Sequence, residues 1–351
     1  MLYAGLDYHK RYSVVQAMDE QGRKRERARL PNEFEAVRDF FDGLGEPCKV
    51  VLEAGWNWGT MFDWLEQVES VEEVQLAHPY RVKAIASAQV KTDAVDAGTL
   101  AHLLRADLIP RAHIPSAETR QLKEIVRQRL FLVRLRTMLK NRLHALLDRH
   151  HVAAPPVSDL FGKRGVGYLA KVQLPEGAQA QLDQDLRLLQ MLNGEVRESE
   201  ALLRRALKGD RRAQVLETVP GIGAITAAVV ALEIDDVKRF PDARKLAAYA
   251  GLVPSVKASG GKVYHGRLMP QSNKWLRWAL VESAWVAVRR DPYFRATYGR
   301  HAHKGPQTAI VATARRLLEV IWHVLSEDRP YEVRTAPVKT RGTSPAALMQ
   351  D

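Results

Sequence analysis

Short apolar runs of strand character alternate with helical spacing over the first hundred residues. Apolar runs at 2–6 and 13–18, followed by a mixed run at 24–30, predict three strands that form an antiparallel meander. The pattern then predicts, in order, a helix at 34–44, a buried strand at 48–52, a helix at 62–68 and a strand at 74–77. Thr92 can cap a further helix over 93–104. These elements predict an α/β domain over residues 1–108.

From residue 116 the pattern changes to long helical periods. Apolar residues recur at helical spacing over 116–150, with basic residues on the other faces. A second helical stretch over 178–207 could pair with the first as a coiled coil, and the Pro- and Gly-rich residues 152–167 predict a turn or linker between them. The region 116–207 is therefore either an ordinary helical hairpin or a coiled coil that grips nucleic acid or a sister protomer.

The pattern over residues 213–328 predicts a compact helical C-terminal domain. Residues 330–351 are polar and lack periodicity, so we expect this tail to be disordered. No apolar run approaches the roughly 18 residues that a membrane helix needs. The start of the chain also lacks the basic and apolar segments of a signal peptide. The single cysteine, Cys48, fits a reducing compartment. We expect a cytoplasmic protein that does not associate with membranes.

Charge is distributed unevenly along the chain. Residues 1–104 carry 12 Lys/Arg against 17 Asp/Glu, whereas the remaining 247 residues carry 41 against 24. A basic surface attracts phosphate backbones through counterion release, and an acidic domain repels them unless cations bridge the two. The second part of the chain is therefore predicted to bind nucleic acid, although a solvated basic face is the alternative.

Four acidic residues stand at the ends of the predicted N-terminal elements. Asp7 ends the first strand and Glu53 the fourth, while Asp93 and Asp96 share one face of a helix because they are three residues apart. If the first and fourth strands are neighbours and this helix packs beside their ends, the four carboxylates converge. Hard cations would offset the charge, and two Mg²⁺ ions support phosphodiester transfer. Taken singly, each acid also has a structural explanation, such as a turn or a helix N-terminus.

Two glycines stand at the start of a second apolar helix. Gly221 and Gly223 would let backbone N–H groups approach a phosphate, as in helix-hairpin-helix DNA-binding proteins, but a tight turn between packed helices is the alternative. Arg127 and Arg134, on the basic faces of the long helix, are further candidates for contact with nucleic acid.

A serine beside two glycines marks the C-terminal domain. Ser259 precedes Gly260 and Gly261, and Lys262 and Arg267 could hold a phosphate that it attacks. Serine is a weak nucleophile that needs a base or a metal. The stretch contains no convincing His/Asp partner, so activation would come from the acidic domain. A flexible loop is the alternative for this motif.

Five segments together resemble the DEDD-type transposases of the insertion-sequence-110 family, which also contains the Piv-type DNA invertases. They are Gly-Leu-Asp-Tyr-His-Lys (5–10), Leu-Glu-Ala-Gly (52–55), Lys-Thr-Asp-Ala-Val-Asp-Ala (91–97), Val-Pro-Gly-Ile-Gly (219–223), and the stretch from Gly-Leu-Val-Pro (251–254) to Ser-Gly-Gly-Lys (259–262). The resemblance covers nearly the whole chain. It implies an RNase H-like (RuvC-like) first domain, a coiled-coil insertion, and a helical transposase domain with a helix-hairpin-helix-like segment.

The resemblance also implies roles for individual residues. The four acids would bind Mg²⁺ or Mn²⁺, with two ions at the site, and Ser259 would form a covalent phosphoserine link to DNA, with Ser255 as its rival. The implied partners are donor and target DNA, a structured non-coding RNA that pairs with both, and further copies of the chain. These copies would form a dimer or tetramer with a shared active site, in the nucleoid of a bacterial or archaeal cell.

We therefore expect a recombinase that inserts and excises a mobile element by strand exchange. One alternative is a junction-resolving endonuclease of the RuvC type, in which water is the nucleophile. The other is a non-catalytic protein that binds nucleic acid through its basic helices.

Overall fold

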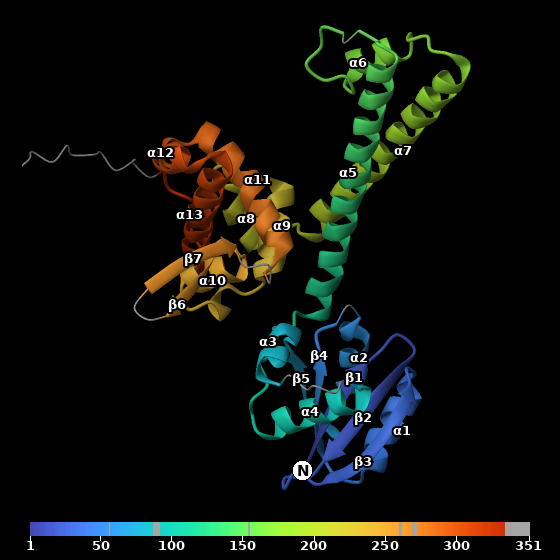
Figure 1. Cartoon of the computed structure of the whole chain (residues 1–351), viewed down its shortest axis with the longest axis vertical. Helices are drawn as coiled ribbons and strands as arrows, with labels where there is room; N and C mark the ends of the chain where they lie inside the picture. Colours follow the sequence, from blue (N-terminus) through green and yellow to red (C-terminus); the bar gives the residue numbers. More distant parts are fainter. Residues whose placement is uncertain (56, 87–91, 154, 260–261, 269–271, 334–351) are drawn as a thin grey trace, which may run out of the picture. The chain divides into compact units, whose positions relative to one another are not determined.

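The computed structural model describes residues 1–333 except 56, 87–91, 154, 260–261 and 269–271. The chain divides into two compact units, one from Met1 to Pro115 and the other from Ser116 onward, and each is described by itself (Figure 1). Among the described helices, none combines the length and apolar character that a bilayer crossing requires.

The N-terminal unit is built on a five-stranded sheet with the order β3-β2-β1-β4-β5. Its strands are β1 (Leu2–Tyr8), β2 (Tyr12–Met18), β3 (Lys24–Pro31), β4 (Cys48–Glu53) and β5 (Val71–Ala77). The first three strands are antiparallel, as predicted from their spacing. β4 runs parallel to β1 and β5 parallel to β4, so the first and fourth strands are neighbours. The mixed α/β character of this region is confirmed.

Helices cover both faces of this sheet. They are α1 (Phe34–Gly43), α2 (Trp58–Leu65), α3 (Pro79–Ile85) and α4 (Asp93–Arg105). Alternate strand residues point to opposite faces, so Val50 packs with the side chains of α1 and α2, whereas Val51 packs with those of α3 and α4. The two core layers thereby fix α4 on one face of the central strands.

Gly5 lets α4 lie directly against β1. A Cβ atom at Gly5 would come within 2.0 Å of the Ala97 carbonyl oxygen and 2.6 Å of the Ala101 nitrogen. The helix begins at the predicted cap, where the Thr92 side chain accepts a hydrogen bond of 3.3 Å from the Val95 nitrogen. The first turn of α4 is therefore held beside the carboxyl end of β1.

The second unit starts with two long helices, α5 (Ala117–Arg149) and α7 (Glu176–Ala206). They are antiparallel, because Leu143 near the end of α5 packs with Leu182 near the start of α7, and Arg129 pairs with Glu200 at their other ends. The short helix α6 (Lys163–Leu169) lies between them in sequence. The predicted turn over 152–167 therefore reaches only to residue 162, because burial of Leu169 stabilises a helical turn despite its two glycines.

The rest of this unit is helical except for a β-hairpin. Its elements are α8 (Arg211–Glu217), α9 (Ala224–Ile234), η1 (Val237–Arg239), α10 (Ala243–Tyr249), β6 (Pro254–Ser259), β7 (Lys262–Leu268), α11 (Lys274–Arg290), α12 (Pro292–His301), η2 (Ala302–Lys304) and α13 (Pro306–Ser326). The prediction of a compact helical domain did not include the antiparallel pair β6 and β7. The Ser-Gly-Gly-Lys motif, for which a flexible loop was the alternative to a nucleophile site, begins at the last residue of β6 and ends at the first residue of β7.

The beginning of the polar tail is packed. The Tyr331 hydroxyl donates a 3.1 Å hydrogen bond to Asp291, and the Tyr331 nitrogen donates a 2.8 Å bond to the Thr218 hydroxyl. Disorder was predicted for residues 330–351. Residues 334–351 of this stretch lie outside the described residues.

A buried cluster of polar groups ties α5 to the C-terminal helices. Glu233 of α9 is 5% exposed and lies 3.5 Å from Lys123 of α5, which is also buried. Its other oxygen lies 3.4 Å from the Arg127 guanidinium. Asn273, which caps α11, donates to Glu233 at 2.9 Å and to the Tyr249 hydroxyl at 3.0 Å. The Glu233 carboxylate therefore links α9 to α5 and to the cap of α11, and Asn273 connects this cluster to Tyr249 of α10.

The contact between Gly5 and α4 predicts a large effect for one methyl group. Gly5→Ala should destabilise the N-terminal unit by about 3 kcal/mol, because backbone atoms of α4 occupy the space that the new Cβ needs. Urea unfolding, with hydrogen exchange at the β1 amides to localise the effect, measures it. Gly43→Ala is the control, since no atom lies within 4 Å of its Cβ position. Equal effects of the two substitutions would contradict the role of this contact.

Removing the Glu233 carboxylate should also destabilise the protein strongly. Glu233→Ala leaves Lys123 buried without its partner, so the free energy of unfolding of the second unit should fall by about 3–5 kcal/mol. The control is Glu319→Ala, which breaks the partly exposed pairs with Arg315 and Arg316 and should cost at most about 1 kcal/mol. Chemical unfolding followed by circular dichroism compares them, and a loss below 1 kcal/mol for Glu233→Ala would refute the prediction.

Candidate active site

The four acidic residues singled out in the sequence line one hollow of about 740 Å³ in the N-terminal unit. The strand register accounts for two of them: Leu6 pairs with Leu52, so Asp7 and Glu53 follow next to each other at the carboxyl ends of β1 and β4. Asp93 and Asp96 belong to the first turn of α4, which Gly5 holds against β1. The structure therefore places all four carboxylates around one hollow.

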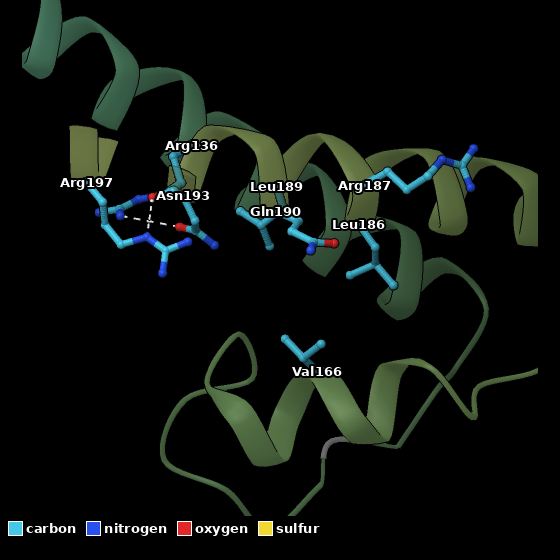
Figure 2. Close-up of a pocket in the computed structure, with 8 residues that line it drawn as sticks. All are labelled: Arg136, Val166, Leu186, Arg187, Leu189, Gln190, Asn193 and Arg197. Atoms are coloured by element: carbon cyan, nitrogen blue, oxygen red, sulfur yellow. Dashed lines mark hydrogen bonds between the residues drawn. The ribbon is translucent and has the colours of Figure 1, made fainter. Parts of the chain in front are cut away.

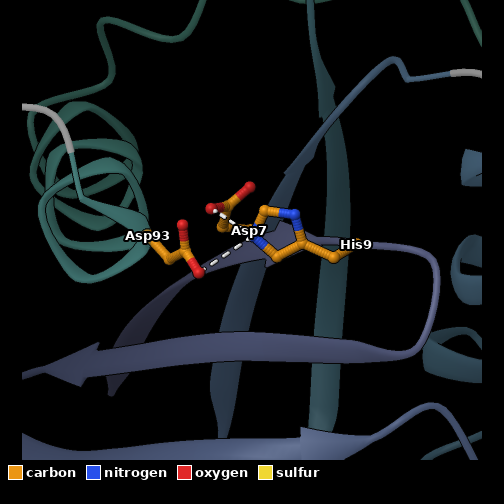
Figure 3. Close-up of side chains that lie close together, drawn as sticks. All are labelled: Asp7, His9 and Asp93. Carbon is orange, nitrogen blue, oxygen red and sulfur yellow. Dashed lines mark ion pairs between the residues drawn. The ribbon is translucent and has the colours of Figure 1, made fainter.

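A histidine lies between two of these carboxylates. His9 Nε2 is 3.1 Å from Asp7 Oδ2 and 3.3 Å from Asp93 Oδ2 (Figure 3). Potential ligand atoms of Asp7, His9 and Asp93 all lie within 4.8 Å of one another. The Tyr12 hydroxyl donates a 3.0 Å hydrogen bond to the same Asp93 oxygen that faces His9. Asp93 is thus oriented by two side chains from the turn between β1 and β2.

Burial and mutual repulsion disfavour the ionised form of the carboxylates in the hollow. Burial raises the pKa of Asp7, and the carboxylates of Asp93 and Asp96 raise it further, whereas His9 acts in the opposite direction. The hydrogen bond to Asp93 raises the pKa of the Tyr12 hydroxyl. Several carboxylate oxygens and one imidazole nitrogen at these separations form a donor set that suits a divalent cation, and a bound cation would relieve the repulsion.

His9 and Tyr12 were not identified as site residues from the sequence. A signal for His9 was present, because it follows Asp7 by two residues and the two-residue period of a strand places both side chains on the same side. Nothing comparable marks Tyr12. Its position depends on the tight connection in which the His9 nitrogen donates to the Tyr12 carbonyl at 3.0 Å.

The candidate nucleophile lies on the β-hairpin of the second unit. Ser259 is the last residue of β6 and stands opposite Lys262, the first residue of β7. The two glycines between them are outside the described residues. Ser255 is near the base of the hairpin, where its hydroxyl packs closely against Gly266. Arg267 is exposed on β7. The hairpin therefore separates the two serines along its length.

The two glycines proposed to approach a phosphate differ in their surroundings. Gly221 has φ +89°, and a Cβ there would meet the Ser283 carbonyl oxygen of α11 at 2.2 Å. Close packing against α11 is therefore sufficient to explain a glycine at this position. Gly223 is exposed at the start of α9 with no atom near its Cβ position. Arg134 is exposed on α5, whereas Arg127 also contacts the buried Glu233.

A second hollow, of about 490 Å³, lies along α7 in the second unit (Figure 2). Its described lining combines three arginines, Arg136, Arg187 and Arg197, with two amides and three aliphatic side chains. The lining contains neither a carboxylate nor a hydroxyl. It offers groups that bind anions but none that could act as a nucleophile or hold a cation, so the acidic hollow is the better candidate for chemistry.

An acidic hollow at the carboxyl ends of parallel strands, in a chain that also carries a strongly basic helical unit, is typical of enzymes that act on phosphodiesters. Comparison with known proteins narrows this class. A DEDD-type transposase model matches residues 4–152, and the model described as the IS116/IS110/IS902 transposase family matches residues 213–299. The chain belongs to this family of DNA transposases and recombinases.

Relatives match along most of the chain. It is 29% identical over 343 residues to a probable family 20 transposase of Pseudomonas aeruginosa, covering 93% of this chain and 97% of that protein. It is 27% identical over 296 residues to the transposase for insertion sequence element IS1328 of Yersinia enterocolitica, covering 80% and 84%. It is also 34% identical over 129 residues to a pilin gene-inverting protein of Moraxella bovis, covering 36% and 40%.

The raised pKa of Asp7 predicts how the metal-free protein responds to pH. Because the folded pKa lies above the ordinary value of 3.8, the stability contributed at this position is present at low pH and is lost as pH rises from 3.8 through the folded pKa. Asp7→Asn should therefore raise the unfolding temperature at pH 7 in EDTA, and the difference should shrink towards pH 3.

Added Mn²⁺ distinguishes this effect from a general stabilisation. The ion should raise the unfolding temperature of the unaltered protein, since a ligand that binds only the folded state stabilises it, and should do so much less in Asp7→Asn. Asp39→Asn changes an exposed carboxylate on α1 and serves as the control. A lower unfolding temperature for Asp7→Asn in EDTA would show that this carboxylate stabilises the fold and would contradict the prediction.

Proposed function

We propose that the chain inserts and excises a mobile DNA element by metal-dependent strand exchange through a covalent phosphoserine intermediate, guided by a structured non-coding RNA. The single observation that carries the proposal is the convergence of Asp7, Glu53, Asp93 and Asp96 on one hollow. Membership of the transposase family supplies the class of reaction.

We assign the N-terminal unit to the RNase H-like, RuvC-type domains. The assignment is supported by three antiparallel strands followed by two parallel ones, with the first strand at the centre of the sheet. The same order of strands places the acids from β1 and β4 side by side. The long helices α5 and α7 would form the coiled-coil region of this architecture.

In this proposal the four acids hold two Mg²⁺ or Mn²⁺ ions. Bound ions would make an attacking oxygen more nucleophilic and stabilise a leaving oxygen. His9 and Tyr12 orient Asp93, and His9 also contacts Asp7, so these side chains preserve the geometry of the acids. Gly5 sets the distance between the acids of α4 and those of the sheet.

Ser259 is the proposed nucleophile. Its hydroxyl oxygen forms a bond to phosphorus while one ester bond to a deoxyribose oxygen breaks, and overall a proton passes from the serine to the departing oxygen. The energy of the phosphodiester is kept in the serine ester, so that a second deoxyribose hydroxyl can reverse the step and join a new strand. Water would instead release that energy, as in the alternative of a junction-resolving nuclease.

The charges of the two parts of the chain support the proposed partners. Residues 1–104 are acidic and the remainder is strongly basic, so donor DNA, target DNA and the guide RNA would be held mainly by the second unit, with Gly223, Lys262, Arg267, Arg127 and Arg134 as candidate contacts. We further propose a dimer or tetramer in which one protomer supplies the acids and another supplies Ser259.

The covalent intermediate can be tested directly. Ser259→Ala should abolish the metal-dependent protein–DNA adduct that forms when the chain is mixed with its flanking transcript and donor DNA, while DNA affinity remains within about twofold because a single uncharged hydroxyl is lost. Denaturing electrophoresis detects the adduct, and peptide mapping locates it. Ser255→Ala is the matched control and should leave the adduct intact.

Adducts that persist in Ser259→Ala and vanish in Ser255→Ala would transfer the role to Ser255. Free 5′-phosphate nicks formed at full rate in Ser259→Ala would favour the nuclease. Asp7→Asn should lower the rates of adduct formation and of strand exchange by about a thousandfold or more, because the cation site loses a charged ligand. The DNA affinity should not change. Full activity in that variant would refute the role of the acids.

A further inference from the structure

Basic residues in the N-terminal unit are concentrated on one edge strand. Residues 23–29 hold five of the fourteen Lys/Arg residues of this unit, which spans residues 1–115. They belong to β3 and the turn before it, at the open edge of the sheet. In a unit that carries more acidic than basic residues, this stretch has the highest density of positive charge along the sequence.

The strand register places two of these arginines on the face that carries the acids. Asp7 stands opposite Val14, and Val14 stands opposite Arg29. Gly5 stands opposite Gln16, and Gln16 opposite Arg27. Residues paired directly across strands project to the same side. Arg29 therefore lies in the same cross-strand row as Asp7, two strands away, or about 10 Å at roughly 4.8 Å per strand.

The arginines of this stretch differ in how they are used within the protein. Arg23 pairs with Asp19 at 2.9 Å, and Arg25 pairs with Glu46 at 3.3 Å. Arg27 and Arg29 are exposed, and neither forms an ion pair with any carboxylate among the described residues. Their positive charge is therefore not offset by a partner within this part of the chain.

Arg29 is nevertheless held in place and linked to the acids. Its guanidinium carbon lies 3.7 Å from the centre of the Tyr12 ring, a close cation–π contact. The Tyr12 hydroxyl donates to Asp93, which faces His9 in the acidic hollow. The aromatic ring thus separates a guanidinium from a carboxylate and keeps both oriented without pairing them.

We propose that Arg27 and Arg29 form a phosphate-binding pair that holds the nucleic-acid strand next to the phosphodiester at the acids. This proposal rests on the proposed function and deepens it by assigning residues that position the substrate. Side chains two residues apart on a strand are separated by roughly 7 Å, so each guanidinium can take its own phosphate. Arg29 is about 10 Å and Arg27 about 12 Å from Asp7 along the sheet, so these phosphates are one or two nucleotides from the reacting one.

The physical need for such a pair follows from the charge of the hollow. Carboxylates repel a phosphate backbone, and charges farther away than the Debye length of about 8–10 Å are screened at physiological salt. Because of this screening, the Lys and Arg side chains of the second unit attract the nucleic-acid strand only where they contact it. Positive charge on the same sheet face as the acids would offset the repulsion locally and fix the register of the strand.

The opposing explanation is that basic residues merely keep an open strand edge from pairing with another chain. Salt dependence distinguishes the two explanations, since each lost phosphate contact makes the slope of log affinity against log salt less steep, by about 0.7 for a single strand. The experiment measures the binding of the full-length chain to a 20-nucleotide mixed-sequence DNA strand and to the same RNA sequence, between 50 and 300 mM NaCl in EDTA.

The double substitution Arg27→Gln with Arg29→Gln should reduce that slope by about 1.4, since two contacts are lost. Arg23→Gln with Arg25→Gln removes the same charge from the same edge and should leave the slope unchanged. Arg27→Lys with Arg29→Lys keeps the charge and should retain the original slope, which separates a charge effect from misfolding.

A reduced slope with DNA alone, RNA alone or both supports the pair and identifies the strand that it holds. An unchanged slope in the Gln double variant, or an equal change in the Arg23 and Arg25 control, overturns the proposal. Because EDTA removes divalent cations, this result is independent of catalysis. Activity that survives in Asp7→Asn would count against the proposed function and leave the phosphate-binding pair standing.

Discussion

The contact between Gly5 and α4 is the constraint on which the acidic site depends. Backbone atoms of α4 approach the Gly5 Cα more closely than any side chain would allow. The same helix carries Asp93 and Asp96 in its first turn. The distance between α4 and the sheet therefore determines how close these two acids come to Asp7 and Glu53. A property of packing, the absence of one methyl group, thus sets the electrostatics of the hollow.

The acids repel one another, so their convergence has to be maintained by the rest of the unit. Strand pairing fixes Asp7 and Glu53, since their neighbours Leu6 and Leu52 are paired and fully buried. The capped start of α4 fixes the other two. Stability of the apolar core therefore offsets an unfavourable arrangement of charge, which is a common feature of functional sites.

Much of this architecture could be predicted from the sequence, because it follows from local periodicity. Four of the five strands and the long helix after Ser116 correspond to apolar runs or regular apolar spacing, whereas β3 is a run of mixed polarity. The cap at Thr92 was recognised from its position before a helical stretch. The acids could be found since each stands where an element ends. His9 was missed although its offset of two residues from Asp7 was visible in the sequence. Tyr12 was missed because its contact with Asp93 depends on a turn that only tertiary structure defines. The β6–β7 hairpin was missed because polar and apolar residues are mixed along both strands, without the apolar runs that mark β1 and β4.

The antiparallel arrangement of α5 and α7 has a consequence for how the chain can change over time. Val126 near the start of α5 and Leu203 near the end of α7 are buried in one hydrophobic core. The arm formed by these two antiparallel helices is therefore anchored at both of its chain ends in the same core. Whole turns could be gained or lost at its far end in matched pairs without disturbing that root. The arm is therefore a module whose reach can evolve separately from the chemistry.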